Sequence, residues 1–283
     1  MSVLGIDAGG SGTKVVLLQG SRFDRVTELP AAPPMNALLT DGIAGRLAKI
    51  ISAAPGVAAV GIGLPGLRSA GAAGQLSQRL RRRVGRPVIV TGDGDIARAG
   101  AFGGEPGIIV IAGTGSAAVG WDGSRRLQAG GHGFLVGDEG SAYWIGRCAV
   151  RAALRWADGM GGSAAIHRAI LEVTGISLDE LIVKINSHSS ERTVVSVLAP
   201  LITDLAETDA AARRITERAA DHLAALAAAV QRRLGPLAVA GTGGVLGSPL
   251  IWERFAAQTG AERPQASPAV GAALLAVGLL PHA

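Results

Sequence analysis

The sequence predicts an α/β protein made of two lobes of similar construction, with a cleft between them. Short apolar runs of strand length alternate with helical patterns along a chain of 283 residues. A strand, a glycine-rich turn and a second strand occur near Asp7 and again near Gly113. Apolar residues make up 48% of the chain and aromatic residues only 3%, so the cores must pack small and aliphatic side chains.

The first half begins with a predicted β-hairpin, because apolar residues 3–6 and 14–19 flank a turn rich in glycine. A third strand is expected at 22–29, followed by a loop at 31–36 with two prolines. The pattern then predicts, in order, a helix at 41–54, a strand at 57–62, a helix at 75–84, a strand at 88–90 and a helix that ends near Phe102.

The second half repeats this beginning. A strand is expected at 107–112 and a turn at 113–116, followed by strands at 117–121 and 125–128. Residues 130–140 form a glycine-rich loop that holds Asp138 and Glu139. The remaining pattern predicts a mainly helical region at 141–234, a strand at 237–240, a glycine turn at 241–244 and helices at 248–259 and 269–280.

Composition excludes several classes of protein. The net charge is +5, but the one dense basic cluster, at 79–83, has no interleaved aromatic residues and is interpreted as a solvated helix end, not a nucleic-acid surface. Cys148 is the only cysteine, which excludes an internal disulfide and an all-thiolate metal site within one chain. Without an apolar run of about 18 residues or a secretory leader, we expect a cytoplasmic protein that does not bind membranes.

Three glycine turns, each directly after an apolar strand, predict a nucleotide site. In the first, Gly9, Gly10 and Gly12 allow backbone N–H groups to approach phosphate oxygens, and Asp7 suits Mg²⁺ bound through water. The turns at 113–116 and 241–244 repeat the pattern, so the phosphates are expected between the two hairpins and the adenosine on the third turn. For the first turn alone, a plain glycine hairpin with Asp7 as a turn former is the alternative.

Acidic residues precede two predicted helices. Asp93 and Asp95 lie between a strand and a helix, where one can be a catalytic base and the other an N-cap, or both can cap. Asp138 and Glu139 can bind substrate hydroxyls or favour a helix N-terminus electrostatically. His132 has no second histidine at ligand spacing, so no metal held by protein ligands alone is predicted.

Several of these segments together resemble one family. The segments are Asp7–Lys14, the Asp93 turn, Ile111–Ser116 and Gly137–Ile145. They are similar to the N-acetylglucosamine kinase group of the BadF/BadG/BcrA/BcrD ATPase family, within the superfamily of sugar kinases, heat-shock chaperones and actin. The resemblance covers nearly the whole chain up to Pro268–Leu275, and the block at 137–145 is its most specific part.

The resemblance implies two actin-like (ribonuclease H-like) lobes with an interlobe cleft. The N-terminal lobe is expected at 1–103 plus 268–283, and the C-terminal lobe, with a helical insertion, at 104–267. The implied activity is ATP-dependent phosphorylation of a small-molecule amino sugar, N-acetylglucosamine or glucosamine, at its 6-hydroxyl, with Mg²⁺. A homodimer is left open, and nucleic acids are not expected partners.

The resemblance also implies roles for individual residues. Asp7 orients Mg²⁺, and Asp93 is the catalytic base. The residues implied for ATP are Gly9, Gly10, Ser11, Gly12, Thr13, Gly113, Thr114, Gly115, Gly243 and Gly244. Those implied for the sugar are Asn36, Asp93, Ser116, Gly131, His132, Gly133 and Asp138. Relatives that bind N-acetylglucosamine often have Trp where this chain has His132, so glucosamine is expected to rival N-acetylglucosamine here.

Three alternatives share the broad fold. An ATP-driven activator of a radical dehydratase needs cysteines that bridge a cluster between subunits, and one cysteine inside a predicted helix argues against it. A non-catalytic sugar sensor is disfavoured because both Asp7 and Asp93 are present. A kinase of the repressor/open-reading-frame/kinase (ROK) type is disfavoured because its cysteine-rich zinc motif is absent.

Overall fold

The computed structural model describes residues 1–9, 12–20, 25–32, 41–67, 70–187 and 191–280. The chain forms two compact units: unit 1 is Met1–Gly107 with Pro264–Ala283, and unit 2 is Ile108–Arg263. These units are close to the expected lobes, whose boundaries at 103/104 and 267/268 stay a prediction. Among the described residues, none of the helices combines the length and apolar character that a membrane span requires.

Unit 1 contains a five-stranded sheet in the order β3-β2-β1-β4-β5. The first three strands are antiparallel neighbours, whereas β4 and β5 continue parallel to β1. The strands are β1 (Ser2–Ala8), β2 (Thr13–Gln19), β3 (Arg25–Ala32), β4 (Ala59–Leu64) and β5 (Val88–Gly92). The helices are α1 (Asp41–Ser52), α2 (Ala70–Val84), α3 (Asp93–Ala101) and α11 (Pro268–Val277).

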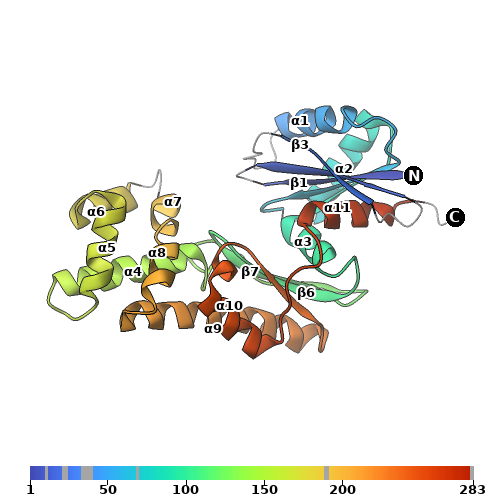
Figure 1. The fold of residues 1–283 in the computed structure, drawn as a ribbon. Coiled ribbons are helices and arrows are strands. Elements are labelled where there is room, and N and C mark those ends of the chain that lie inside the picture. The colour runs from blue at the N-terminus through green and yellow to red at the C-terminus, as the bar shows by residue number, and fades with distance from the viewer. Residues whose placement is uncertain (10–11, 21–24, 33–40, 68–69, 188–190, 281–283) are drawn as a thin grey trace. The chain divides into compact units, whose positions relative to one another are not determined.

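The helices of unit 1 cover both faces of its sheet (Figure 1). One core joins α1 and α2 to Leu4, Ile6 and other side chains of the same face, and a second core joins α11 to the opposite face through Val3. The backbones of β1 and α11 lie so close together that a Cβ on Gly5 would meet the backbone of Ala269. Residues from the far end of the sequence therefore complete the first unit.

Unit 2 contains a four-stranded sheet in the order β8-β7-β6-β9, with β9 parallel to β6 and β8 antiparallel to β7. The strands are β6 (Gly107–Ala112), β7 (Ser116–Trp121), β8 (Arg126–Gly130) and β9 (Val239–Thr242). The helices are α4 (Ala142–Ala157), α5 (Ala164–Thr174), α6 (Leu178–Asn186), α7 (Glu191–Ser196), α8 (Ala199–Leu205), α9 (Ala210–Leu234), η1 (Val245–Gly247) and α10 (Pro249–Thr259).

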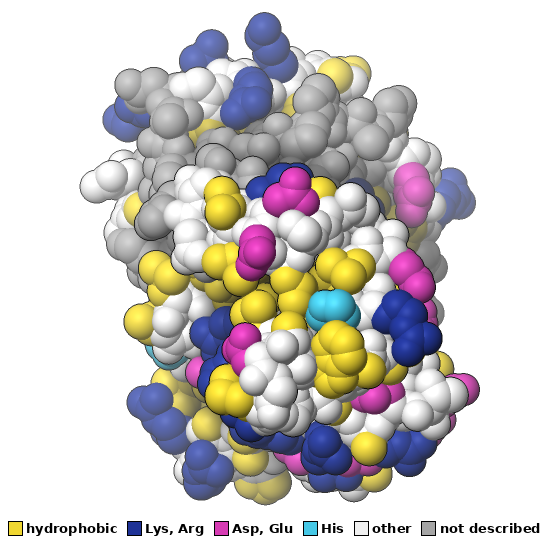
Figure 2. Space-filling view, turned by 90° about the vertical axis from the view of Figure 1, so that its left-hand side faces the viewer, with side chains coloured by type: hydrophobic (Ala, Val, Ile, Leu, Met, Phe, Trp, Pro, Cys, Tyr) yellow, Lys and Arg dark blue, Asp and Glu magenta, His cyan; other side chains and the backbone are white. Residues whose placement is uncertain are grey.

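One core holds unit 2 together, and it joins the sheet to α4, α9 and α10. Several large apolar side chains of unit 2 stay exposed, among them Trp156, Met160, Val173 and Val183. Figure 2 shows hydrophobic side chains gathered around a histidine on one face of the molecule. A homodimer stays a prediction.

Several expected boundaries were wrong. β3 ends at Ala32, inside the expected loop, because a register shift between Thr13 and Val15 moves its pairing with β2. α2 begins at Ala70, ahead of the expected start at 75. The sequence pattern did not reveal this first turn, because its residues are Ala and Gly and show no amphipathic periodicity. β9 includes Gly241 and Thr242, so the third glycine turn begins only at Gly243.

Candidate active site

The carboxyl ends of the parallel strands in unit 1 bring two predicted acids to one edge of the sheet. Asp7 of β1 is in register with Gly63 of β4, and Gly63 is in register with Thr91 of β5. Asp93 begins α3 directly after β5. Ligands of open α/β sheets bind at this edge, outside the carboxyl ends of the strands.

The two carboxylates influence each other electrostatically. Burial raises the pKa of Asp7 above its ordinary value, the charge of Asp93 raises it further, and Lys14 lowers it in part. A hard divalent cation, which oxygen ligands bind best, would relieve the repulsion between two acids at a partly buried edge. The donor set of unit 1 therefore fits Mg²⁺.

Asp95 does not cap α3, contrary to one interpretation of the sequence. The N-cap is Gly92, without a side-chain hydrogen bond, because the helix starts directly at Asp93. Asp95 lies in the first turn and its Oδ2 accepts a hydrogen bond of 2.7 Å from Thr91 Oγ1. Asp93 Oδ1 accepts a bond of 2.9 Å from Gly94 N. Asp95 therefore fastens the end of β5.

The first glycine turn is described only in part. A Cβ on Gly9 would lie 2.9 Å from the Gly12 carbonyl oxygen, so the turn is tight at that point. Thr13 is fully buried, which favours a role in holding the hairpin. Gly10, Ser11 and Asn36, which were assigned to phosphate and sugar binding, lie outside the described residues.

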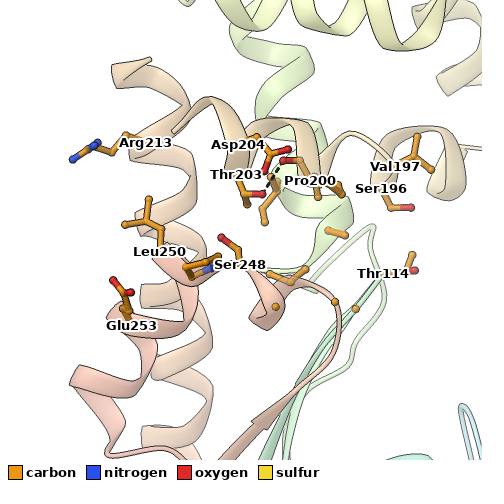
Figure 3. Close-up of a pocket in the computed structure, with 18 of the residues that line it drawn as sticks. Thr114, Ser196, Val197, Pro200, Thr203, Asp204, Arg213, Ser248, Leu250 and Glu253 are labelled. Carbon is orange, nitrogen blue, oxygen red and sulfur yellow. Dashed lines mark hydrogen bonds between the residues drawn. The ribbon is translucent and has the colours of Figure 1, made fainter. Parts of the chain in front are cut away.

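The second and third glycine turns line one pocket in unit 2. The cavity measures about 990 Å³ and is lined by Gly113 and Thr114 from one turn and Gly244 from the other. Figure 3 shows Thr114 at one end of this pocket and Leu250 and Glu253 at the other. A volume near the upper end of the usual range for ligand pockets accommodates a nucleotide. Because two turns predicted to bind a nucleotide line this cavity, we call it the nucleotide pocket.

Backbone contacts hold the two turns of the nucleotide pocket in place. Ala142 N, at the start of α4, donates to Gly113 O at 2.9 Å, and Tyr143 N donates to Thr114 O at 3.4 Å. Gly243 has a φ of +105°, and a Cβ there would meet the backbone of Ala112 at the end of β6. Only glycine fits this position, and it allows the turn after β9 to lie beside the turn after β6.

Asp138 is the most unusual residue of the loop after β8. It is 3% exposed, and among the described non-glycine residues it alone has a positive φ, of 61°. Its Oδ1 accepts a long bond of 3.4 Å from Ser116 N, whereas Oδ2 lacks a hydrogen-bond partner among the described residues. A strained, buried and half-satisfied carboxylate is typical of a functional site.

Hydrogen bonds join another predicted sugar residue, Ser116, to the loop that contains Asp138. Ser116 donates its hydroxyl to the Glu139 carbonyl at 2.7 Å, and Gly131 N donates to Ser116 O at 2.8 Å. His132 is exposed, and a Cβ on Gly137 would lie 3.1 Å from its Cβ. The structure therefore brings Ser116 and the 131–138 loop together, and the Ser116 hydroxyl holds that loop.

The sequence reasoning missed Arg192 of α7, which extends to the Asp138 carboxylate. Its Nη2 lies 3.5 Å from Asp138 Oδ2, and its guanidinium lies 5.9 Å from the Phe134 ring centroid. The close packing of Gly146 against Val195 fixes α7 on α4. A lone arginine in a helical insertion without a motif gives no signal in one sequence. The same holds for Thr203, Glu207 and Arg213 of the nucleotide pocket.

Comparison with known proteins places the chain in a family. The model of the BadF/BadG/BcrA/BcrD ATPase family matches residues 4–276. The chain belongs to this family. It is 29% identical over 238 residues to the N-acetylmuramic acid/N-acetylglucosamine kinase of Clostridium acetobutylicum, and this match covers 78% of the chain and 76% of that relative. The predicted family is therefore confirmed.

Solved structures give the same fold. A candidate N-acetylglucosamine kinase from Chromobacterium violaceum aligns with 97% of this chain and 98% of its own, with a TM-score of 0.76 and 28% identity. A ROK family glucokinase from Streptomyces griseus, solved with glucose and AMPPNP, aligns with a TM-score of 0.63 at 18% identity, over 98% of this chain and 100% of its own. The latter similarity concerns the fold alone. The predicted actin-like fold class is confirmed.

Proposed function

We propose that this protein is an ATP-dependent kinase that phosphorylates an amino sugar, N-acetylglucosamine or glucosamine, at the 6-hydroxyl. The observation that carries the proposal is the single pocket of about 990 Å³ that unites the Gly113–Thr114 turn with Gly244. Both turns were expected to hold a nucleotide, and the family is one of ATPases. The names of the relatives from Clostridium acetobutylicum and Chromobacterium violaceum support an amino-sugar acceptor.

In this proposal unit 2 holds the nucleotide. The exposed Thr114 side chain lies at one end of the pocket, where it suits a phosphate, and the pocket extends from there toward Leu250 and Glu253. The adenosine then lies along the Gly243–Gly244 turn. Backbone N–H groups of glycine turns provide the phosphate contacts without a Cβ in the way.

Unit 1 contributes the two acids. Asp7 is assigned to Mg²⁺, bound through water. Burial and the nearby charge of Asp93 raise the pKa of its carboxyl group, and a bound cation would offset both effects. Bound Mg²⁺ supplies neutralisation of the phosphate charge in the transition state. Asp93 is assigned as the general base, since it follows the carboxyl end of β5 and its companion Asp95 already accepts a bond from Thr91.

The proposed reaction is a displacement at the γ-phosphorus of ATP. The sugar hydroxyl oxygen forms a bond to phosphorus, its proton passes to Asp93, and the bond between phosphorus and the β,γ-bridging oxygen breaks to release ADP. Asp138 accepts hydrogen bonds from sugar hydroxyls, because its buried Oδ2 has the capacity for further donors. Ser116 acts through the loop, which its hydroxyl fastens at Glu139.

An ADP-release assay with MgATP tests the proposal. The acceptors are N-acetylglucosamine, glucosamine, N-acetylmuramic acid and glucose, and ³¹P–¹H correlation locates the phosphate on the product. We expect turnover with an amino sugar and a phosphate on the 6-oxygen. Binding of a sugar without ADP release would instead support the sensor alternative, and no response to any acceptor would overturn the kinase proposal.

A further inference from the structure

A second pocket of unit 2 is lined by four exposed arginines among ten residues. It measures about 510 Å³ and lies between α4, which contributes Arg151 and Arg155, and α9, which contributes Arg214 and Arg218. It shares no lining residue with the nucleotide pocket. We call it the arginine pocket.

The charges of the arginine pocket are not compensated. No acidic side chain lines it, and within the described part of the chain Arg151 and Arg214 have no ion pair. Arg155 is used locally, since its Nη2 donates to Met160 O at 2.6 Å. The arginines on each helix are four residues apart, a spacing at which like charges destabilise a helix. Both helices that line the pocket are therefore destabilised by repulsion between their arginines, and an anionic ligand would relieve this repulsion.

The pocket also has an aromatic and an apolar wall. Trp144 lines it, and the guanidinium of Arg218 lies 5.8 Å from the Trp144 ring centroid. Ala152 and Ile215 contribute aliphatic surface. Guanidinium groups bind phosphate oxygens in a bidentate manner. Arginines beside an aromatic and apolar wall therefore suit a phosphate ester with an organic group.

We propose that the arginine pocket binds a small organic phosphate with two negative charges. The four arginines line one cavity of about 510 Å³, which has the size of a small-molecule site and favours this ligand class over a polynucleotide. The proposal does not depend on the kinase reaction, because the site lies outside the nucleotide pocket and involves none of the residues assigned to the sugar.

Cys148 provides a direct measure of occupancy. It is the only cysteine of the chain, it lines the arginine pocket and it is partly exposed. Burial raises the pKa of its thiol, so alkylation is followed at about pH 8.5 to obtain a usable rate. The probe is glucose 6-phosphate, without ATP, and the comparison ligands are glucose, inorganic phosphate and a short single-stranded RNA.

We expect glucose 6-phosphate to slow the alkylation of Cys148 and glucose to leave it unchanged. Arg151→Gln and Arg214→Gln should each weaken this protection by about tenfold, the loss of one charge-assisted hydrogen bond. Arg232→Gln is the matched control, because Arg232 is exposed on the same helix α9 but does not line the pocket. Circular dichroism and Tm verify that each variant is folded.

Four results would overturn the proposal. Equal protection by glucose would place the effect outside the arginine pocket, as would full protection in both folded pocket variants. Equal protection by inorganic phosphate at the same concentration would indicate an adventitious ion only. Protection by RNA alone would assign the surface to a polynucleotide. Because ATP and turnover are absent from the assay, a failure of the kinase proposal leaves its result intact.

Discussion

Asp7 and Asp93 both lie at the carboxyl edge of the sheet in unit 1, where the charge of Asp93 helps to raise the pKa of Asp7. The register Asp7–Gly63–Thr91 creates this relationship, since it aligns the ends of three parallel strands. The intervening Gly63 leaves room for Ile96 of α3, because a Cβ on this glycine would meet the Ile96 side chain. The fold thus keeps two like charges close together, an arrangement that favours binding over stability.

Asp7→Asn should stabilise the metal-free protein and impair catalysis. A raised pKa means that the folded state holds the Asp7 proton more tightly than the unfolded chain does. Stability therefore falls as the pH rises from about 3.8 through the raised pKa, and the loss is complete above it. At neutral pH with EDTA, Asn should raise Tm, and the difference from wild type should shrink toward acid pH.

Magnesium separates the metal role of Asp7 from a purely structural one. Added Mg²⁺ with ATP should raise the Tm of wild type more than that of Asp7→Asn, and the variant should need more Mg²⁺ for half-maximal turnover. Identical Mg²⁺ dependence of turnover in the two proteins would show that Asp7 is only a residue of the hairpin.

Asp93→Asn should lower kcat by roughly 10²–10⁴-fold, the usual effect of a positioned acid or base. Asparagine keeps the shape and can still accept the bond from Gly94 N, but it cannot take the sugar proton. The KM for the sugar should change far less. Steady-state kinetics of ADP release measure both constants.

Asp95→Asn is the matched control for Asp93. Asparagine can still accept the bond from Thr91 Oγ1, so we expect near-normal kcat and a small change in Tm. An inactive Asp95→Asn together with an active Asp93→Asn would reverse the assignment. If both variants are active, neither residue is the general base.

Gly243→Ala should damage both stability and ATP binding. Its Cβ would meet the backbone of Ala112, which belongs to β6 and cannot give way as a side chain can. Gly235 has a comparable φ of +95° but open space around it, so Gly235→Ala measures the backbone strain alone. We expect a larger drop in Tm and a higher KM for ATP in Gly243→Ala. Equal effects in the two variants would show that the contact with β6 is unimportant.

The strands and glycine turns were predictable because their signals are local. Apolar runs and turn residues gave the β1–β2 hairpin and β6, and the family resemblance indicated Asp93 and Asp138. The start of α2 was missed because the alanines and glycines that begin it lack periodicity. The burial of Thr13, the bond from Ser116 to Glu139 and the approach of Arg192 depend on tertiary packing, which one sequence does not encode locally.

His132 should tune the choice of acceptor. It is exposed in the 131–138 loop, at a position where the family resemblance predicts a contact with the sugar. Imidazole offers less apolar surface to an acetyl methyl group than indole does, and one such contact changes discrimination by about 1–3 kcal/mol. We expect His132→Trp to raise the ratio of kcat/KM for N-acetylglucosamine over glucosamine. A ratio that stays at the wild-type value would remove His132 from the specificity of the enzyme.

Asp138→Asn should weaken sugar use and leave the fold intact. Asparagine tolerates the positive φ of 61° and fills the same space beside Gly115, but it lacks the charge. A hydrogen bond to a charged group contributes about 1.5–3 kcal/mol, so kcat/KM for the sugar should fall by about 10–150-fold. The KM for ATP should change little, because Asp138 does not line the nucleotide pocket.

Glu139→Gln is the control that assigns this effect to Asp138. The two residues are neighbours and both are acidic, but Glu139 is exposed and its contact with Ser116 uses the backbone carbonyl, which the substitution preserves. Normal kinetics are therefore expected for Glu139→Gln. If Glu139→Gln loses sugar affinity and Asp138→Asn does not, the sugar contact belongs to Glu139. In that case the strain at Asp138 serves only to turn the loop toward α4, and a drop in the Tm of Asp138→Asn would be its sign.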